Sequence, residues 1–193
     1  QNDSNSIESK INAGLGWGNI TTALRYNRVI TNKLFMNLTG TYSRYNFSVG
    51  QSFEEISTPT NPDIDFNYSS EYNSGIYDWS GRLDFDYIPN PKHYIKFGLS
   101  DIYHTFVPGV NVFKAAGGGG ETGIDTTLGA SRIYAHEYFA YVQDDFKIGT
   151  RFKANIGLHF SGFVTSNDHF YALQPRISTR YLINEHLSVK ASY

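Results

Sequence analysis

The chain has 193 residues, no cysteine, 18% charged residues and a formal net charge of −2. The lack of cysteine excludes disulfides, thiol catalysis and cysteine metal sites, and the balanced charge provides no basic footprint for nucleic acid. No run approaches the roughly 18 apolar residues of a transmembrane helix. Aromatic residues reach 16%, with 15 Tyr and 14 Phe, so we expect a chain built from β-strands.

Residues 1–10 are polar and predict a loop, with no signal peptide. From there, apolar and polar residues alternate with the period of two that a strand requires. The clearest example is the stretch in which Trp79, Gly81, Leu83, Phe85 and Tyr87 alternate with Ser80, Arg82, Asp84 and Asp86. Alternation of this kind predicts eight strands, at about 11–29, 34–47, 71–88, 94–106, 132–146, 152–163, 173–182 and 187–193. Pro175 is expected near a strand start or beside a bulge, because proline lacks a ladder donor.

The connections between these strands alternate in length. Short ones are expected at 30–33, 88–93, 147–151 and 183–186, and longer ones at 48–70, 107–131 and 164–172. In an antiparallel meander, all short turns then lie at one end and all long loops at the other, as in outer-membrane barrels. The alternating run at Trp79 is about ten residues long and aromatic at both ends, which suits a tilted membrane-crossing strand with interfacial girdles.

The sequence therefore predicts an all-β fold: an antiparallel up-and-down meander of about eight long strands, part of a transmembrane β-barrel. We expect residues 1–193 to form a single partial barrel domain. The mean hydropathy of −0.39 is compatible with this, because half of each strand would face a polar lumen. A chain that starts in a loop and stops on a strand is also what a truncated barrel would show.

Four stretches carry a resemblance to a known family. They are Trp17-Gly18-Asn19 with Leu24-Arg25-Tyr26-Asn27; Lys33-Leu34-Phe35 with Tyr42-Ser43-Arg44-Tyr45; Asp78-Trp79-Ser80-Gly81 with Tyr103-His104-Thr105-Phe106; and Tyr141-Val142-Gln143-Asp144-Asp145-Phe146 with Gln174-Pro175-Arg176-Ile177-Ser178. In order and spacing they resemble the barrel of TonB-dependent outer-membrane receptors, of the type with a carboxypeptidase-regulatory-like domain before the plug.

The resemblance implies a middle fragment of a barrel of about 22 strands, with the plug absent. It implies a Gram-negative outer-membrane receptor that imports a scarce solute, such as a siderophore or a glycan, with TonB-coupled energy. The implied partners are outer-membrane lipid, the receptor's own plug domain and the TonB complex through the missing plug region, with a surface lipoprotein left open. No enzyme activity, cofactor or nucleic acid is implied.

Two other functions stay open. If Tyr193 is the natural C-terminus, eight strands could close into a small complete barrel with a structural or adhesive role. A soluble β-domain that binds glycans through its aromatic residues is the third possibility.

The candidate site residues fall into two groups. The first is expected to face the lumen: Arg82, Asp84, Asp86, Lys96, Arg176 and Arg180. Asp84 and Asp86 could suggest acid–base chemistry, but alternating charge on a lumen wall is the preferred interpretation. The second group consists of aromatic residues expected in loops, as ligand-binding candidates: Phe53, Phe66, Tyr68, Phe170 and Tyr171.

Two further patterns have ordinary interpretations. The six histidines lack close metal-ligand spacing, so no metal site is predicted. The glycines at 117–120 are interpreted as a flexible loop tip and not as a phosphate cradle, because no Lys-Ser/Thr pair follows them.

Overall fold

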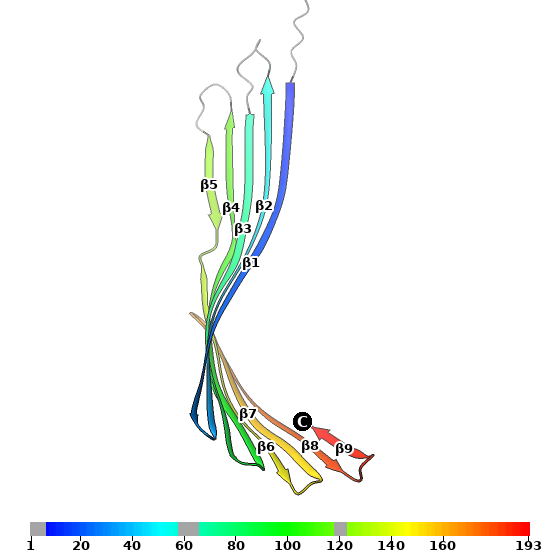
Figure 1. The fold of residues 1–193 in the computed structure, drawn as a ribbon. Coiled ribbons are helices and arrows are strands. Elements are labelled where there is room, and N and C mark those ends of the chain that lie inside the picture. The colour runs from blue at the N-terminus through cyan, green and yellow to red at the C-terminus, as the bar shows by residue number, and fades with distance from the viewer. Residues whose placement is uncertain (1–6, 58–65, 118–122) are drawn as a thin grey trace, which may run out of the picture. The chain divides into compact units, whose positions relative to one another are not determined.

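The computed structural model describes residues 7–57, 66–117 and 123–193, and every regular element in these ranges is a β-strand (Figure 1). The strands are β1 (Ile7–Thr31), β2 (Leu34–Ser57), β3 (Phe66–Asn90), β4 (His93–Gly117), β5 (Ile124–Gly129), β6 (Ile133–Ile148), β7 (Phe152–Thr165), β8 (His169–Leu182) and β9 (Ser188–Ser192). The described ranges contain no helix long and apolar enough to cross a membrane.

The strands form one sheet in the order β1-β2-β3-β4-β6-β7-β8-β9, and β5 pairs with β4. Apart from β5, the strands follow one another across the sheet in sequence order, so the predicted antiparallel up-and-down meander is confirmed. In the described part of the chain β1 pairs only with β2, and β9 only with β8. Every residue of β1 except Gly16 is correspondingly exposed. These two strands are the open edges that a barrel fragment would present.

Most strands are longer than the sequence predicted, with β1 beginning already at Ile7 inside the expected loop at 1–10, and a ninth strand was missed. β2 continues to Ser57, β3 begins at Phe66, β4 continues to Gly117, and β5 lies where only a loop was expected. The expected loops were therefore wrong over most of 48–70 and 107–131. Pro59, Pro62, the acidic residues Asp63 and Asp65, and the glycines at 118–120 lie outside the described residues.

The expected loop at 164–172 was also wrong, because β7 and β8 meet in a tight turn. The Thr165 hydroxyl oxygen accepts hydrogen bonds from the backbone N–H groups of Asn167 and Asp168, at 3.3 and 3.0 Å. β8 consequently begins at His169, so Pro175 is not near a strand start. Pro175 instead pairs with Leu158 of β7 in the middle of β8. β9 pairs only with Ser178–Leu182 of β8, so in the described part of the chain Pro175 has a partner strand on one side alone.

The short turns are closed by local hydrogen bonds, as turn chemistry requires. The Asn90 side-chain oxygen accepts from the backbone N–H of Lys92 at 2.9 Å. The Asn184 side chain does the same for His186 and Leu187, also at 2.9 Å. The β6–β7 turn contains Gly149 at φ 61°, a conformation that side chains with a Cβ rarely adopt.

The chain divides into two compact units. Unit 1 comprises 1–20, 44–77 and 105–133, and unit 2 comprises 21–43, 78–104 and 134–193. Among the described residues no large side chain is fully buried, and the buried hydrophobic residues are Ala135 and Ala154. A water-soluble domain places its large apolar side chains in a core. Here they lie on the surface of the sheet.

Unit 1 has an aromatic side and a side of small polar residues. On the aromatic side, Phe47 contacts Tyr72 and Phe53 contacts Phe66, with ring centroids 6.5 and 6.2 Å apart. On the other side, the Asn12 amide donates to the Ser52 hydroxyl at 3.4 Å. Most aromatic and aliphatic residues of β2 are even-numbered at Leu34–Tyr42, with Phe35 as the exception, and odd-numbered at Phe47, Val49 and Phe53. Because side chains alternate, the apolar side of β2 changes along the strand.

Candidate functional site

Unit 2 presents a continuous apolar face, which the strand register defines. Val142, Leu158 and Pro175 lie opposite one another on β6, β7 and β8. Leu158 is 43% exposed and Trp79 is 62% exposed. The apolar face comprises Leu38, Tyr42, Trp79, Leu83, Phe85, Phe97, Leu99, Ala140, Val142, Ile156, Leu158, Phe160, Leu173 and Ile177. No second layer of unit 2 covers these side chains, as a soluble sandwich would require.

Aromatic rings pack side by side within the apolar face. Phe85 stacks on Phe97 at 4.9 Å, which leaves Phe85 half-buried by its neighbour and not by an overlying layer. Tyr42 and Trp79 approach to 4.6 Å. Next to the apolar face, two residues beyond Asp101 and His136 on their strands, Tyr103 stacks on Tyr134 at 6.0 Å. Rings that are exposed to one side and packed laterally are what an interfacial girdle requires.

Two hydrogen-bonded pairs of polar residues bracket the apolar face between β4 and β6. His136 Nδ1 lies 3.0 Å from an Asp101 carboxylate oxygen, and His93 Nδ1 lies 2.6 Å from Asp144 Oδ2. Eight residues separate the pairs on each strand, and those between them on this face of β4 are Ile95, Phe97 and Leu99. Eight residues span about 26 Å along a strand. With a tilt of about 40° the apolar band is about 20 Å tall, close to that of outer-membrane barrels.

The opposite side of unit 2 is polar and hydrogen-bonded across strands. Asp84 accepts from Arg82 Nε and from the Tyr141 hydroxyl, each at 2.7 Å. Asp86 accepts from the Tyr94 hydroxyl at 2.6 Å and from the Asn37 amide at 3.4 Å. We call this side the polar face: Asn37, Arg82, Asp84, Asp86, Tyr94, Lys96, Tyr141, Asp145, Lys147, Lys153, Asn155, Arg176, Ser178, Arg180 and Lys190.

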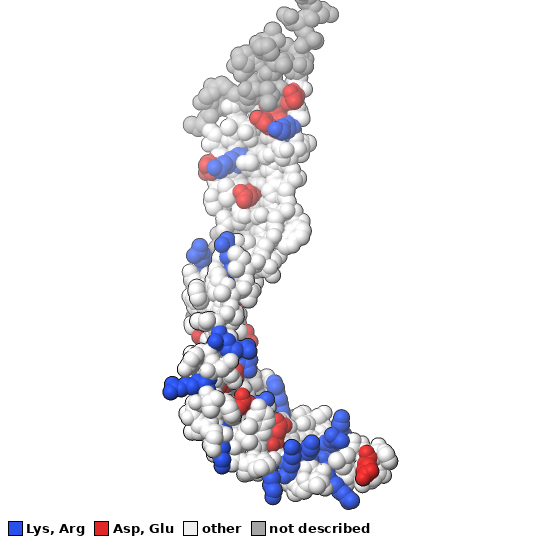
Figure 2. Space-filling view, viewed as in Figure 1, with Lys and Arg blue, Asp and Glu red and all other residues white. Residues whose placement is uncertain are grey.

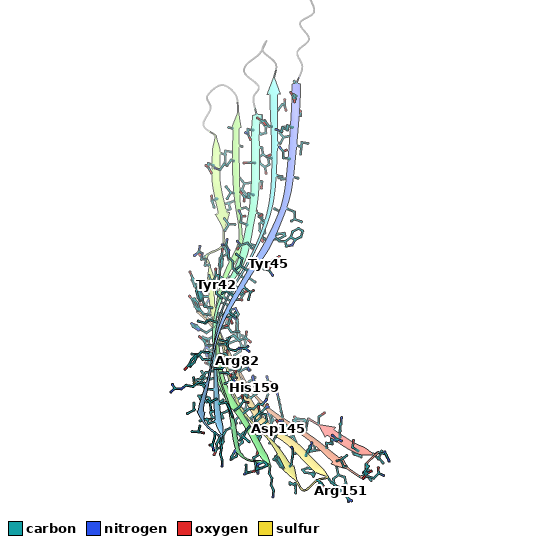
Figure 3. All side chains as sticks on the ribbon, in the orientation of Figure 1. Tyr42, Tyr45, Arg82, Asp145, Arg151 and His159 are labelled. Carbon is teal, nitrogen blue, oxygen red and sulfur yellow. The ribbon has the colours of Figure 1, made fainter. Side chains whose placement is uncertain are left out.

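Cations on the polar face also pack against aromatic rings. The Arg82 guanidinium lies 5.5 Å from the centre of the Phe139 ring, and Lys96 Nζ lies 4.7 Å from that of Tyr94. Figure 3 shows side chains on both sides of the strands, Arg82 among them. The structure thus brings together four of the predicted lumen residues, Arg82, Asp84, Asp86 and Lys96.

The geometry of Asp84 and Asp86 suits a wall and not a reaction centre. Asp84 accepts from Arg82 of its own strand and from Tyr141 of β6, and Asp86 accepts from Tyr94 of β4, so both carboxylates are held by donors. A groove of about 360 Å³ beside them is lined by Arg25, Asn27, Asn37, Thr39, Arg82 and Asp84. The described residues contain no group of three or more His, Asp or Glu side chains placed to hold a metal ion.

Arg176 and Arg180 lie on the polar face of β8. Arg176 donates to the Gln174 side-chain oxygen at 3.2 Å, and Arg180 lies opposite Lys153 and Lys190. Sequence reasoning missed Lys147 and Lys153, although both occupy polar-face positions of the strand pattern. It also missed Tyr94, Tyr141 and the pairs that bracket the apolar face, because cross-strand register is needed to find them.

The aromatic ligand candidates lie in strands, so their expected loop placement was wrong. In unit 1, Phe53 and Phe66 contact each other, and Tyr68 is half-buried in β3. In unit 2, Tyr171 stacks on Phe160 of the apolar face at 6.1 Å, while Phe170 lies opposite Phe163. Phe170 and Tyr171 therefore point to opposite sides of β8. A role for these residues in ligand binding stays a prediction.

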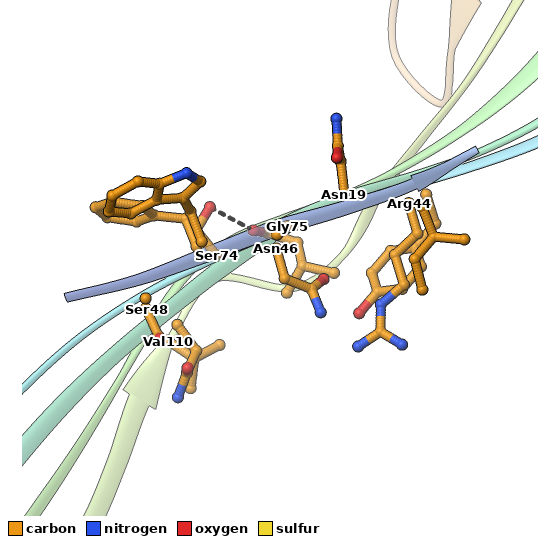
Figure 4. Close-up of a pocket in the computed structure, with 15 residues that line it drawn as sticks. Asn19, Arg44, Asn46, Ser48, Ser74, Gly75 and Val110 are labelled. Atoms are coloured by element: carbon orange, nitrogen blue, oxygen red, sulfur yellow. Dashed lines mark hydrogen bonds between the residues drawn. The ribbon is translucent and has the colours of Figure 1, made fainter. Parts of the chain in front are cut away.

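Unit 1 contains the groove drawn in Figure 4, with a volume of about 610 Å³. Arg44 lies with its guanidinium 5.5 Å from the centre of the Tyr77 ring. Figure 4 shows Arg44, Ser48 and Val110 on one side of the strands and Asn19 on the other. Among the described residues that line the groove, Arg44 is the single charged one.

Comparison with known proteins agrees with the membrane-barrel geometry of the sheet. A family model described as TonB dependent receptor-like, beta-barrel matches residues 2–193. No curated protein matches the chain. The family consists of transport receptors of the Gram-negative outer membrane, which are not enzymes. An all-β meander with one apolar and one polar face, matched over nearly its full length, places the chain in the TonB-dependent receptor-like β-barrel family.

Proposed function

We propose that this chain forms part of the wall of a receptor barrel that takes up a scarce solute across the outer membrane with TonB-coupled energy. The observation that supports this most directly is the division of unit 2 into two faces. The apolar face is exposed and bracketed by polar pairs about one hydrocarbon layer apart, and suits lipid. The polar face is cross-linked by hydrogen bonds between strands, and suits the wall of a lumen.

The partners of the polar face would be a plug domain and, through it, the TonB complex. A wall whose polar groups already have partners can be in contact with a polar plug without leaving buried groups unpaired. A surface lipoprotein stays open as a further partner. Family membership supports the plug and the TonB complex as partners, and the polarity of the wall is compatible with a plug.

The solute would be a siderophore, a glycan or a similar molecule. The aromatic side of unit 1 supports a ligand with flat apolar surfaces, because Phe53 and Phe66 present adjoining rings and Phe66 is 42% exposed. Sugars and aromatic siderophore groups both stack on such rings.

The experiment is an uptake assay in the natural host, with and without its tonB function. Cells with the intact gene, a deletion and a Phe66→Ala variant are compared for growth on single iron chelates and single glycans. We expect one solute whose use requires both the receptor and TonB, and weaker uptake by the Phe66→Ala cells. Uptake that is equal with and without TonB would contradict the proposal.

The small complete barrel is tested by the mass of the natural protein. A mature mass far above the 21.8 kDa of this chain would rule that alternative out. The soluble glycan-binding domain is tested by membrane fractionation, because it would be extracted without detergent.

A further inference from the structure

The apolar face of unit 2 contains a groove of about 660 Å³ that is lined by residues of β4, β6 and β7. Ala140 of β6 has the smallest of these side chains, and the larger Leu99 and Phe160 lie on the two neighbouring strands. A volume of this size is within the range of sites that hold small molecules. We call it the Ala140 groove; the side chains that matter below are Leu99, Asp101, His136, Ala140, Phe160 and Val164.

The groove stays open because the Tyr138 ring lies over a glycine of the next strand. Tyr138 is directly opposite Gly162 of β7, and a Cβ at position 162 would lie 2.6 Å from the Tyr138 Cζ atom. The ring of Tyr138 also contacts those of Phe160 and Tyr171, with centroids 6.3 and 6.4 Å away. The side chain is thereby directed along the sheet towards β7 and β8, and Ala140 stays exposed.

One end of the Ala140 groove is polar and carries a carboxylate. Asp101 and His136 both line the groove, and the side chain of each is 51% exposed. His136 Nδ1 lies 3.2 and 3.0 Å from the two Asp101 carboxylate oxygens, which have further lone pairs to accept hydrogen bonds. The Tyr103 ring lies 4.9 Å from that of His136 and stacks on Tyr134. A carboxylate beside tyrosine rings attracts an organic cation.

The charge at this end discriminates among membrane lipids. No Lys or Arg lines the groove within the part of the chain that the structure describes. Most Lys and Arg side chains of β6–β9 gather at the far end of these strands, beside the β6–β7 and β8–β9 turns (Figure 2). A negatively charged head group would be repelled by Asp101, with no cation in the groove to offset the repulsion. A primary ammonium can instead donate charge-assisted hydrogen bonds to that carboxylate.

We propose that the Ala140 groove binds one membrane lipid with a primary ammonium in its head group, a lipid of the phosphatidylethanolamine class. One acyl chain lies along Ala140 between Leu99 and Phe160, and the ammonium donates to Asp101 beside the Tyr103 ring. This inference rests on the proposed function, because it requires the apolar face to contact lipid. It adds to that function a selected lipid class and a defined place on the face.

The other edge of the apolar face provides a matched control. His93 and Asp144 form the same kind of pair there, with His93 Nδ1 2.6 Å from the carboxylate. Neither of them lines the Ala140 groove, and the His93 ring packs against Phe146 at 6.1 Å. Comparison of the two pairs therefore separates the effect of the groove from that of a carboxylate and an imidazole alone.

The test uses the natural receptor in phosphatidylglycerol vesicles that contain a small fraction of phosphatidylethanolamine with a photoactivatable diazirine on its acyl chain. After irradiation, peptide mass spectrometry locates the labelled residues. Labelling of Phe160 and Val164 is expected to exceed that of Ile156, which lies on the same strand and face but outside the groove. We expect an excess of about tenfold, as one hydrogen bond to a charged group allows. Phosphatidylglycerol with the same diazirine is expected to label these residues without this preference.

Four substitutions connect the labelling to the groove. Asp101→Asn is expected to remove the preference, whereas Asp101→Glu and Asp144→Asn keep it. Ala140→Phe fills the groove and is expected to lower labelling of Phe160 to the level of Ile156. A preference that survives Asp101→Asn would overturn the inference. Equal enrichment of the phosphatidylglycerol probe at Phe160 would also overturn it, because the groove would then accept any acyl chain.

Failure of this inference is distinguishable from failure of the proposed function. If both probes label the apolar face uniformly, the face contacts lipid and the selective site alone is wrong. If neither probe labels Ile156, Phe160 or Val164, this face does not contact lipid, and both are wrong.

Discussion

A single arginine introduced in the middle of the apolar face tests whether that face contacts lipid or water. Ala140 of β6 is exposed, lies opposite Phe160 of β7, and is four residues from each of His136 and Asp144, the β6 members of the two bracketing pairs. Replacing Ala140 with arginine removes no packed side chain and opens no cavity. The effect of Ala140→Arg therefore reports almost entirely on the cost of placing a charge at that depth.

The expected cost follows from the position. Arginine on the lipid face of a barrel costs about 2–4 kcal/mol at the bilayer midplane and about 0–1 kcal/mol near the interfaces. Ala140 lies midway between the bracketing pairs, so we expect the upper range. A loss of 2–4 kcal/mol lowers the folding equilibrium constant by about 30-fold to 1000-fold. On a surface that met water, the same change would alter stability by at most about 0.5 kcal/mol.

The assay is equilibrium unfolding of the natural protein in lipid vesicles with guanidinium, followed by tryptophan fluorescence. Gln143→Arg is the matched control, because Gln143 lies on the same strand but points to the polar side, opposite Gly157. We expect that control to change the free energy of unfolding little. Ala140→Leu should be neutral or slightly stabilising. Equal tolerance of arginine at 140 and 143 would refute the assignment of the faces.

Three other substitutions test separate parts of the structure. Tyr141→Phe removes one of two donors to Asp84 and should lower the free energy of unfolding by about 1 kcal/mol, whereas no change would show that the contact is not formed. Gly149→Val should destabilise the β6–β7 turn by about 1–2 kcal/mol because of its positive φ, and Gly149→Asn by less; equal effects would contradict that reason. Gly109→Val should force the Tyr72 ring away, since a Cβ at 109 would overlap it. The double change with Tyr72→Ala should recover much of that loss in a double-mutant cycle, and strict additivity would contradict the contact.

The two faces could be predicted from the sequence because alternation is a property of a single strand. Leu83 and Asp84 point to opposite sides whatever their neighbours are, so Arg82, Asp84, Asp86 and Lys96 could be assigned to the polar sides of their strands; that this side lines a lumen stays a prediction. Their partners could not be predicted in the same way. Tyr141 is 57 residues from Asp84 along the chain, and only the sheet order brings the two together.

The strand ends were predicted poorly for a different reason. The segment 48–70 is rich in Ser and the segment 107–131 is rich in Gly, and both residue types usually indicate loops. In the structure the strands continue through them, with aromatic residues such as Phe53 and Phe66 on one side and small polar residues on the other. A strand that has left the hydrocarbon no longer needs an apolar outer side. Its composition then resembles that of a loop, while its period of two persists.

Asp144 shows a third limit. Next to Asp145 it looks like one of two solvent-facing carboxylates, yet it occupies an apolar-face position of β6. Only the register across to His93, 2.6 Å away, gives it a partner and a place at the edge of the apolar band. The same holds for Asp101 and His136 at the other edge.

The most direct measurement of the central claim uses Trp79, one of the two tryptophans of the chain. The natural protein is made as a Trp17→Phe variant and reconstituted in lipid vesicles, so that Trp79 is the one fluorescent tryptophan within residues 1–193. Any tryptophans elsewhere in the receptor are replaced by phenylalanine in the same way. Lipids brominated on their acyl chains should quench its fluorescence strongly, while aqueous iodide should quench it weakly. Strong quenching by iodide with none by brominated lipid would show that this side of the sheet meets water, and the account of its two faces would be wrong.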